Sequence, residues 1–470
     1  NSMAAAYDPH SSYLAAQDLK NFDISIKLSL EGIGAVLRWE DGYTVVNSIV
    51  PGGAAARNGK LKPDDRIIAV AQGKQAFESV IDMRLNKVVQ LIRGKRGTKV
   101  GLQVLRKTKK GFDTLKIVIV RDKILLKDGE AQSSIFEYPA LGENKSKQET
   151  LRIGVIKLPS FYVDFNDRRK NPSNYKSASR DVKVHLKKFV EENVDGVILD
   201  LRNNGGGGLD EAINMAGLFI GHNPVVIVRQ SGGRRVTVHR SRERAIYTGP
   251  LVIMLNRYSA SASEILAGAM HDFQRAILVG DTTTFGKGTV QNIFQLPEGY
   301  GALKVTIAQF YRVSGWSTQN RGVETSFVLP SLNNAREIGE STLDNALPWR
   351  SIDQVSYRVS GNLKKVLPKL KQLSENRIAN SEFFQKVKED VQEYLTTIKP
   401  LKYTSILKMQ EDDLRRKTQR DQELESASEK ADEDNSDDTE IEEEKKGIQR
   451  DEYMKESLEI LSDYIKLQKK

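Results

Sequence analysis

Short apolar runs alternate with amphipathic segments through residues 150–335, and this alternation restricts the fold more than any other feature of the chain. Each run has the length of one buried strand, and the segments between the runs carry apolar residues at helical spacing. Buried strands that alternate with helices form a sheet covered by helices, so we expect a layered α/β core. The expected strands are 153–158, 196–201, 225–228, 251–255 and 276–279, and the expected helices are 182–192, 209–220 and 261–273.

Residues 27–125 have a different pattern, in which short alternating strands are separated by turns rich in Gly, Pro and Asp. One helix is expected at 81–93, where apolar residues recur at helical spacing before a glycine. This stretch therefore predicts a small β-rich domain. Its expected strands are 34–38, 44–49, 66–70, 99–105 and 115–120.

The two ends of the chain differ from these regions. Residues 1–26 read as an entry segment of the main body, which we expect at 126–335. Residues 336–470 are helical and highly charged, and the stretch near 425–444 is mostly acidic and typical of a solvated linker. In this C-terminal region, the expected helices are 363–373, 383–398 and 453–467.

Composition removes several classes of function. The 470 residues include no cysteine, so disulfide and thiol chemistry are excluded. The net charge is +10, but Lys and Arg are scattered rather than grouped around aromatic residues, which disfavours a nucleic-acid partner. No apolar run is long enough to span a bilayer, so at most peripheral membrane association is expected. The start shows no signal-peptide pattern, but it is not a natural start either.

The run LEGIGAVL at 30–37 places two glycines directly before a strand. Gly32 and Gly34 allow the backbone to turn its N–H groups toward one point, which suits a terminal carboxylate. An extended peptide could pair with the following strand, beside an apolar wall on the helix formed by Leu85, Val89 and Ile92. On these residues alone, a glycine hairpin with a core-facing helix is an equal alternative.

Ser261 and Lys287 are the catalytic candidates. Ser261 opens a helix after a buried strand, where unpaired N–H groups suit a developing oxyanion, although serines at this position also serve simply as N-caps. Lys287 lies between two glycines with few charges nearby, and burial could make its amine neutral and therefore basic. Gln291 follows four residues later and could orient the amine if the stretch is helical or tightly turned. The alternative for Lys287 is an ordinary surface turn.

Histidine does not compete well as the base. His271 lies ten residues after Ser261 on the same expected helix, a rise of about 15 Å, which excludes a Ser261–His271–Asp272 triad. His10 reads as a turn or packing residue. The glycine run at Gly205–Gly208 lacks the ending of a phosphate-binding loop, so it fits an oxyanion donor better, with a loose turn as the alternative.

Several longer motifs carry a resemblance to a known family. GIGAVL, VNSIVPGGAAARNGKLKPDDRIIAV and VVQLIRGKRGTKVGLQVLR resemble a PDZ domain of the type found in bacterial proteases. DPHSSY, GVILDLRNNGGG, SASASEILAGAM, VGDTTTFGKGTVQ and FYRVSGWSTQNRGVETSFVLP resemble the tail-specific, carboxy-terminal processing serine peptidases, and the charged C-terminal region resembles that of their long Gram-negative members. The match runs in order through about residues 5–335.

The resemblance implies a PDZ domain inserted in a Ser–Lys protease with a crotonase-like α/β core. It implies Ser261 as nucleophile, Lys287 as general base, Gln291 as orienter of the lysine, Ala262 and Gly206 as oxyanion-hole donors, and Gly32, Ile33, Gly34 and Ala35 as the carboxylate loop.

The implied function is a periplasmic serine endopeptidase. It would recognise apolar C-terminal tails of unfolded or tagged proteins through its PDZ domain and cleave through an acyl-enzyme, without cofactor or metal. Protein substrates are the expected partners, and an adaptor lipoprotein is a further candidate. The alternative is a non-catalytic PDZ scaffold or chaperone with a dormant protease fold.

Overall fold

The computed structural model describes residues 2–109, 111–140, 149–233, 235–297, 299–398 and 451–468. The acidic stretch expected near 425–444 lies outside these residues. The chain divides into two compact units: Asn21–Gly129 forms one, and Asn1–Lys20 joins Glu130–Lys470 to form the other. The smaller unit is therefore an insertion in the sequence of the larger unit.

The larger unit is built on a six-stranded sheet in the order β10-β11-β12-β15-β16-β19. The strands from β11 to β19 run parallel, and β10 is an antiparallel edge strand. The central strands β12 and β15 are buried along their whole length because helices cover both faces of the sheet. The strands are β10 (Gln132–Ala140), β11 (Glu149–Lys157), β12 (Gly196–Asp200), β15 (Leu251–Leu255), β16 (Ile277–Gly280) and β19 (Phe327–Val328).

Three helices connect these strands, at α6 (Ala178–Glu191), α7 (Leu209–Ile220) and α8 (Ala262–Asp272). Helix α6 contacts β11, and α8 contacts both β16 and strand β13 of a second sheet, so α8 lies between the two sheets. The second sheet is antiparallel, in the order β1-β18-β13-β14, with β17 paired to β18. Its strands are β1 (Ser12–Leu14), β13 (Pro224–Gln230), β14 (Val236–Arg240), β17 (Thr289–Gln295) and β18 (Ala302–Tyr311).

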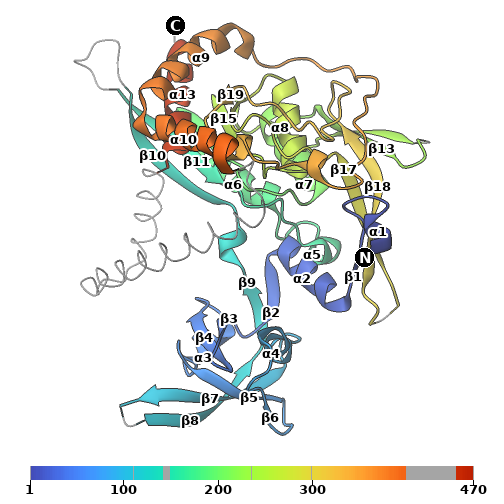
Figure 1. Ribbon diagram of the computed structural model, residues 1–470, viewed down its shortest axis with the longest axis vertical. Coiled ribbons are helices and arrows are strands. Elements are labelled where there is room, and N and C mark those ends of the chain that lie inside the picture. Colours follow the sequence, from blue (N-terminus) through green and yellow to red (C-terminus); the bar gives the residue numbers. More distant parts are fainter. Residues whose placement is uncertain are drawn as a thin grey trace. The chain divides into compact units, whose positions relative to one another are not determined.

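The C-terminal helices share a core with the six-stranded sheet. They are α9 (Leu363–Asn380), α10 (Glu382–Glu393), continued by a π-helical turn at Tyr394–Ile398, and α13 (Glu452–Gln468) (Figure 1). Leu461 and Ile465 of α13 lie so close to Gly196 of β12 that a Cβ at this glycine would approach them to 2.9 and 3.0 Å. These helices therefore complete the hydrophobic core of the sheet.

The smaller unit contains all five strands and the helix expected for the β-rich domain. Its sheet has the order β3-β4-β5-β7-β8, with β6 paired to β5, and β2 pairs separately with β9. Buried residues of the sheet, α3 and α4 form its own hydrophobic core. Its elements are β2 (Ser29–Gly32), β3 (Ala35–Glu40), β4 (Tyr43–Ile49), α3 (Ala54–Asn58), β5 (Arg66–Gln72), β6 (Glu78–Ser79), α4 (Leu85–Ile92), β7 (Lys99–Thr108), β8 (Gly111–Val120) and β9 (Asp122–Leu125).

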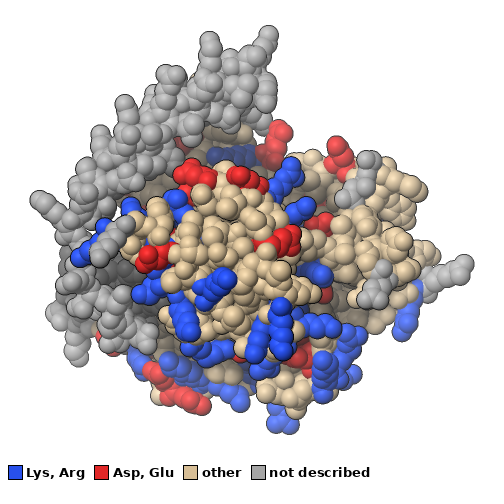
Figure 2. Space-filling view, turned by 90° about the horizontal axis from the view of Figure 1, so that it is seen from below, with Lys and Arg blue, Asp and Glu red and all other residues tan. Residues whose placement is uncertain are grey.

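These elements confirm a mixed α/β architecture with a small β-rich domain and a helical C-terminal region. Among the described helices, none combines the length and apolar character that a membrane span needs. Figure 2 shows Lys and Arg side chains dispersed over one face together with acidic side chains and uncharged areas. The short remaining helices are α1 (Ser2–Ala5), α2 (Ala16–Lys27), α5 (Phe165–Lys170) and 3₁₀ turns at Lys127–Gly129, Leu332–Asn334 and Glu340–Thr342.

Candidate active site

Ser261 lies at the junction between the parallel sheet and helix α8. The chain leaves β15 at Leu255, and Ser261 is the N-cap residue of α8. Its backbone has φ 55° and ψ −108°, a combination that residues with a side chain rarely adopt. Such strain costs about 1–3 kcal/mol and persists only where surrounding contacts hold it. The strained turn places a half-buried hydroxyl at the N-terminal end of a helix.

Glu264, in the first turn of α8, joins the Ser261 turn to the Lys287 turn. Its side chain is fully buried. Its Oε2 accepts the backbone N–H groups of Ser261 and Lys287 at 2.7 and 2.9 Å. Its Oε1 accepts the Thr284 hydroxyl and the Gly286 N–H, both at 2.6 Å. Burial raises the pKa of Glu264 to about 7, and the four donors oppose this shift.

The turn that carries Lys287 is fixed by backbone hydrogen bonds on both sides of the lysine. The N–H of Phe285 donates to the carbonyl of Ser259, two residues before Ser261, at 3.0 Å. The N–H of Asn320 donates to the carbonyl of Gly286 at 2.7 Å. The amine is therefore carried by an anchored turn rather than by a long free loop.

The Lys287 side chain is half-buried, and within the described part of the chain its amine has no hydrogen-bond partner. Burial lowers the pKa of Lys287 to about 8, and the positive charge of Lys304 acts in the same direction. The carboxylates of Glu340, Glu264 and Asp8 raise this pKa and so oppose the shift. The neutral amine, the form that a general base needs, is therefore accessible near pH 8.

Gln291 lies in strand β17 and not in a helix, with a bulge in its pairing to β18 between Val290 and Gln291. Its amide nitrogen donates to the hydroxyls of Thr289 and Thr306, at 2.9 and 3.1 Å. These two bonds use both amide hydrogens, so only the carbonyl oxygen of Gln291 remains for an amine donor.

The glycine loop at Gly205–Gly208 reaches the Ser261 turn through Gly206. A Cβ at Gly206 would approach the Ser261 Cβ and the Ala260 carbonyl, each to 2.9 Å, and the backbone has φ +106°. However, the single N–H of Gly206 already donates to Oδ1 of buried Asn204 at 2.9 Å. The expectation that Gly206 supplies an oxyanion donor therefore does not fit this geometry. Its neighbours Gly205 and Gly207 are exposed, and their N–H groups donate to no acceptor among the described residues.

Ala262, the other expected oxyanion donor, is the first residue of α8. The first N–H groups of a helix have no partner within the helix. The Ala262 N–H donates to no acceptor in the described part of the chain, and the residue is almost completely buried. This N–H is therefore available beside Ser261.

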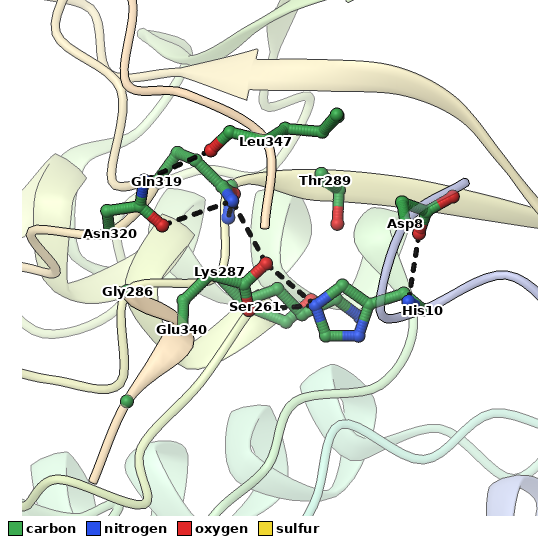
Figure 3. A network of polar contacts seen from close by, with 12 residues as sticks. Asp8, His10, Ser261, Gly286, Lys287, Thr289, Gln319, Asn320, Glu340 and Leu347 are labelled. Atoms are coloured by element: carbon green, nitrogen blue, oxygen red, sulfur yellow. Dashed lines mark hydrogen bonds and ion pairs between the residues drawn. The ribbon is translucent and has the colours of Figure 1, made fainter. Parts of the chain in front are cut away.

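A polar network lies beside Lys287 (Figure 3). The His10 ring contacts both carboxylate oxygens of Glu340, and the Gln319 amide donates to the same carboxylate. The backbone N–H of His10 donates to Asp8, which also accepts the Thr306 hydroxyl. His10 thus does more than shape a turn, because it pairs with a buried carboxylate near the candidate base.

The expected peptide-binding residues lie in the smaller unit. Gly34 has φ +76°, and the carbonyls of Ile33 and Gly34 accept N–H groups of Ala55 and Val50, so the loop before β3 has a fixed shape. On α4, Ile92 is buried in the core of this unit, whereas Leu85 and Val89 are half-buried. Leu85 and Val89 therefore form the apolar part of α4 that is open to a ligand. Gly32 ends β2, and Ala35 begins β3.

Glu264, Asn204 and the His10–Glu340 contact were not foreseen from the sequence. The spacing from Ser261 to Glu264 has the Ser-x-x-Glu pattern of a capping box, which indicates a carboxylate bonded to the N-cap N–H. The pattern could therefore have revealed Glu264. His10 and Glu340 are separated by 330 positions, and no local pattern links them.

Family models match three successive parts of the chain. They describe a PDZ domain at residues 23–105, peptidase family S41 at 152–329, and the C-terminal domain of tail specific protease at 333–466. The tail-specific protease of Haemophilus influenzae is 42% identical over 387 residues, which cover 81% of this chain and 52% of that protein.

Two further matches cover more of the matching proteins. The carboxy-terminal-processing protease of Bartonella bacilliformis is 34% identical over 333 residues, which cover 70% of this chain and 68% of that protein. Among solved structures, a photosystem II D1 C-terminal processing protease has 25% identity and a TM-score of 0.39, with 70% of this chain and 80% of that chain covered. The chain spans about half the length of the Haemophilus protein.

Proposed function

We propose a function from one premise: this chain belongs to peptidase family S41, together with the carboxy-terminal processing proteases that it matches. This membership confirms the family expected from the sequence motifs. The proposed activity is that of a serine endopeptidase, which recognises apolar C-terminal tails through its PDZ domain. The observation that carries the proposal is the shared carboxylate of Glu264, which holds the Ser261 and Lys287 turns together beside a lysine of lowered pKa.

In the proposed reaction, the neutral amine of Lys287 takes the proton of the Ser261 hydroxyl as Oγ attacks the scissile carbonyl. The tetrahedral intermediate then collapses and expels the amine of the C-terminal product, which takes its proton from the Lys287 ammonium. Water, activated by the same lysine, hydrolyses the acyl-enzyme and releases Ser261. Gln291 is proposed to hold the lysine through its carbonyl oxygen, because its amide hydrogens are already used.

The oxyanion of the intermediate is proposed to bind two backbone N–H groups. One is that of Ala262, at the start of α8, where the helix also contributes partial positive charge. The other comes from the glycine loop, where Gly205 and Gly207 have N–H groups that are not used elsewhere among the described residues. Gly206 is proposed to act differently, since its lack of a side chain allows the loop to touch the Ser261 turn.

Tail recognition is proposed to occur in the PDZ domain. The loop formed by Gly32, Ile33, Gly34 and Ala35 would bind the terminal carboxylate through backbone N–H groups, and β3 would pair with the tail. Leu85 and Val89 of α4 are half-buried and would contact an apolar side chain at the end of the tail. Proteins with such tails, unfolded or tagged, are the proposed substrates.

The periplasm is the proposed site of action, and an adaptor lipoprotein that delivers substrates is a proposed partner. Both proposals are supported by family membership alone. Cell fractionation with antibodies to the chain tests the first proposal, and recovery of a lipoprotein with the cross-linked chain tests the second.

The test of the activity uses an unfolded protein with an apolar C-terminal tail, incubated with the chain in the presence of a metal chelator. Wild type should cleave this substrate and spare the same protein with an acidic tail. Ser261→Ala and Lys287→Ala should each abolish cleavage to a similar extent, because a nucleophile and its base act as a unit. Both variants should still bind the tail. Tail binding without any cleavage by wild type would instead favour the non-catalytic scaffold or chaperone.

A further inference from the structure

Glu340 is a buried carboxylate next to the Lys287 turn, and the reaction proposed above does not use it. Its side chain has 0% exposure. Nε2 of His10 lies 2.9 Å from Oε1 and 2.7 Å from Oε2, and Nε2 of Gln319 donates to Oε1 at 2.9 Å (Figure 3). Both oxygens of an ionised carboxylate are acceptors, so Nε2 of His10 carries a proton in this contact.

Glu340 is connected to the backbone on both sides of Lys287. Before the lysine, the N–H of Glu340 donates to the carbonyl of Phe285 at 2.9 Å. After the lysine, the N–H of Gly288 donates to Oε1 of Gln319 at 2.8 Å, and the amide nitrogen of the same Gln319 donates to Glu340. A change at Glu340 would therefore reach the Lys287 turn through only one intervening residue.

His10 is itself fixed to the second sheet. Asp8 accepts the His10 backbone N–H at 2.8 Å and the Thr306 hydroxyl at 2.9 Å. Thr306 also accepts the amide of Gln291, and its N–H donates to the Ser11 hydroxyl. The segment around His10 is thus joined by hydrogen bonds to Thr306 of β18 and, through it, to Gln291 of β17.

We propose that His10 and Glu340 form a positioning pair for Lys287. The pair fixes the turn that carries the amine, and His10 offsets the negative charge that Glu340 places beside it. This inference rests on the proposed function, in which Lys287 is the general base.

The electrostatic part of the inference follows from the sign of the charges. A buried anion near an amine favours the ammonium form, which is the wrong form for a base. Glu340 does raise the pKa of Lys287, against the effect of burial. A histidine N–H bonded to both carboxylate oxygens withdraws part of this negative charge from the amine. The other charged groups that act on the amine are Lys304 of β18, Glu264 of α8 and Asp8 of the N-terminal segment.

Three variants test the effect of the Glu340 charge and of His10 on the acid limb, which is the pH range below which kcat falls. Glu340→Gln keeps the size of the side chain and removes its charge, so the acid limb of the kcat profile should move to lower pH by about one unit. His10→Leu keeps much of the bulk of the side chain but removes the N–H that contacts both carboxylate oxygens, so the limb should move to higher pH. The double variant should return toward wild type, because the charge that His10 offsets is then absent. KM should change little in all three.

Glu456→Gln is the matched control. Glu456 is also a buried carboxylate, but its partners are the Arg377 guanidinium and the Ser374 hydroxyl of the C-terminal helices. Removing the charge of Glu456 should leave the pH of the acid limb unchanged. An NMR titration of the Lys287 amine in the Ser261→Ala background gives the same shifts where a variant is too slow for kinetics.

Two results would overturn the pair. One is an acid limb and a Lys287 titration that both stay at the wild-type pH in the folded Glu340→Gln and His10→Leu variants. The other is a shift of both variants in the same direction, which indicates a purely structural effect. Failure of the proposed function looks different: Lys287→Ala or Ser261→Ala would then retain cleavage.

Discussion

The backbone N–H groups of Ser261 and Lys287 donate to the same atom, Oε2 of Glu264, at 2.7 and 2.9 Å. Their two nitrogens can therefore be no further apart than the sum of these distances. One buried carboxylate thus sets the spacing between the turn of the proposed nucleophile and the turn of the proposed base. The two residues are held together by their main chains, independently of any contact between their side chains.

Replacing Glu264 with Gln should damage catalysis more than substrate binding. The amide puts an NH₂ group against N–H or O–H donors, so one pair of hydrogen bonds is lost and the two turns move apart. We expect kcat to fall by about 100-fold, with KM nearly unchanged, and the free energy of unfolding to fall by about 1–3 kcal/mol. Steady-state kinetics on a tailed peptide and urea unfolding measure both effects.

Glu211→Gln provides the matched control for this substitution. Glu211 is also buried in the first turn of a helix, but all of its hydrogen bonds, from Ser177 and Ser179, go to Oε2. The carbonyl oxygen of a glutamine can keep them all. Wild-type kcat in Glu264→Gln, or an equal loss in both variants, would contradict the role given to Glu264.

The rate should depend on pH through Lys287. Its lowered pKa of about 8 means that the ammonium form dominates below this pH and the neutral base above it. We therefore expect kcat/KM to rise with pH and to level off above about pH 8, with a loss of about tenfold for each pH unit below the limb. Peptide hydrolysis measured from pH 5.5 to 10 checks this. A rate that is constant below pH 7 would argue against a lysine base.

Gly206→Ala should inactivate the protein, whereas Gly205→Ala should be tolerated. A Cβ at Gly206 would come within 2.9 Å of the Ser261 Cβ, and the backbone there has φ +106°, which disfavours any side chain. At Gly205, nothing lies within 4 Å of an added Cβ. We expect a loss of about 100-fold or more in kcat for the first variant and less than about threefold for the second. Equal activities of the two variants would show that the loop does not touch the Ser261 turn.

Leu461→Ala should destabilise the protease body from a position in the C-terminal helix. Leu461 has 0% exposure and packs against Gly196 of the parallel sheet. Removing such a side chain costs about 2–5 kcal/mol. Leu395→Ala, at a residue that is 42% exposed, should cost less than about 0.5 kcal/mol. Urea unfolding of both variants measures the difference, and an unchanged midpoint for Leu461→Ala would show that α13 is not part of the core.

Most of the regular structure could be predicted from the sequence, because each element carries a local pattern. Helix α7 has the expected bounds, and the expected strands of the small domain and of the parallel sheet are all present. The hairpin of β17 and β18 was not foreseen. As a result, Gln291 was considered for a helix or a tight turn, although it lies on a strand. A strand at a bulge has no strict alternation to reveal it.

The candidate site could be predicted only in part. Ser261, Lys287 and Gln291 could be named as candidates because they stand in short motifs. Gly206 was also found, but its hydrogen bond to Asn204 depends on how the loop folds back, which the motif does not encode. Helical spacing also does not show which side of a helix packs inward. Ile92 was therefore expected to face a ligand, but it lies in the hydrophobic core of the smaller unit.

The alternation of strands and helices in the core and the candidates for nucleophile and base came from the sequence alone, since periodicity and short motifs act over a few residues. The tertiary structure decided which buried charges surround the lysine. Glu264 reaches the Lys287 turn across 23 positions, and His10 reaches Glu340 across 330. Such contacts arise only when sheets and helices pack, because packing sets both the distance between the charges and the loss of water around them.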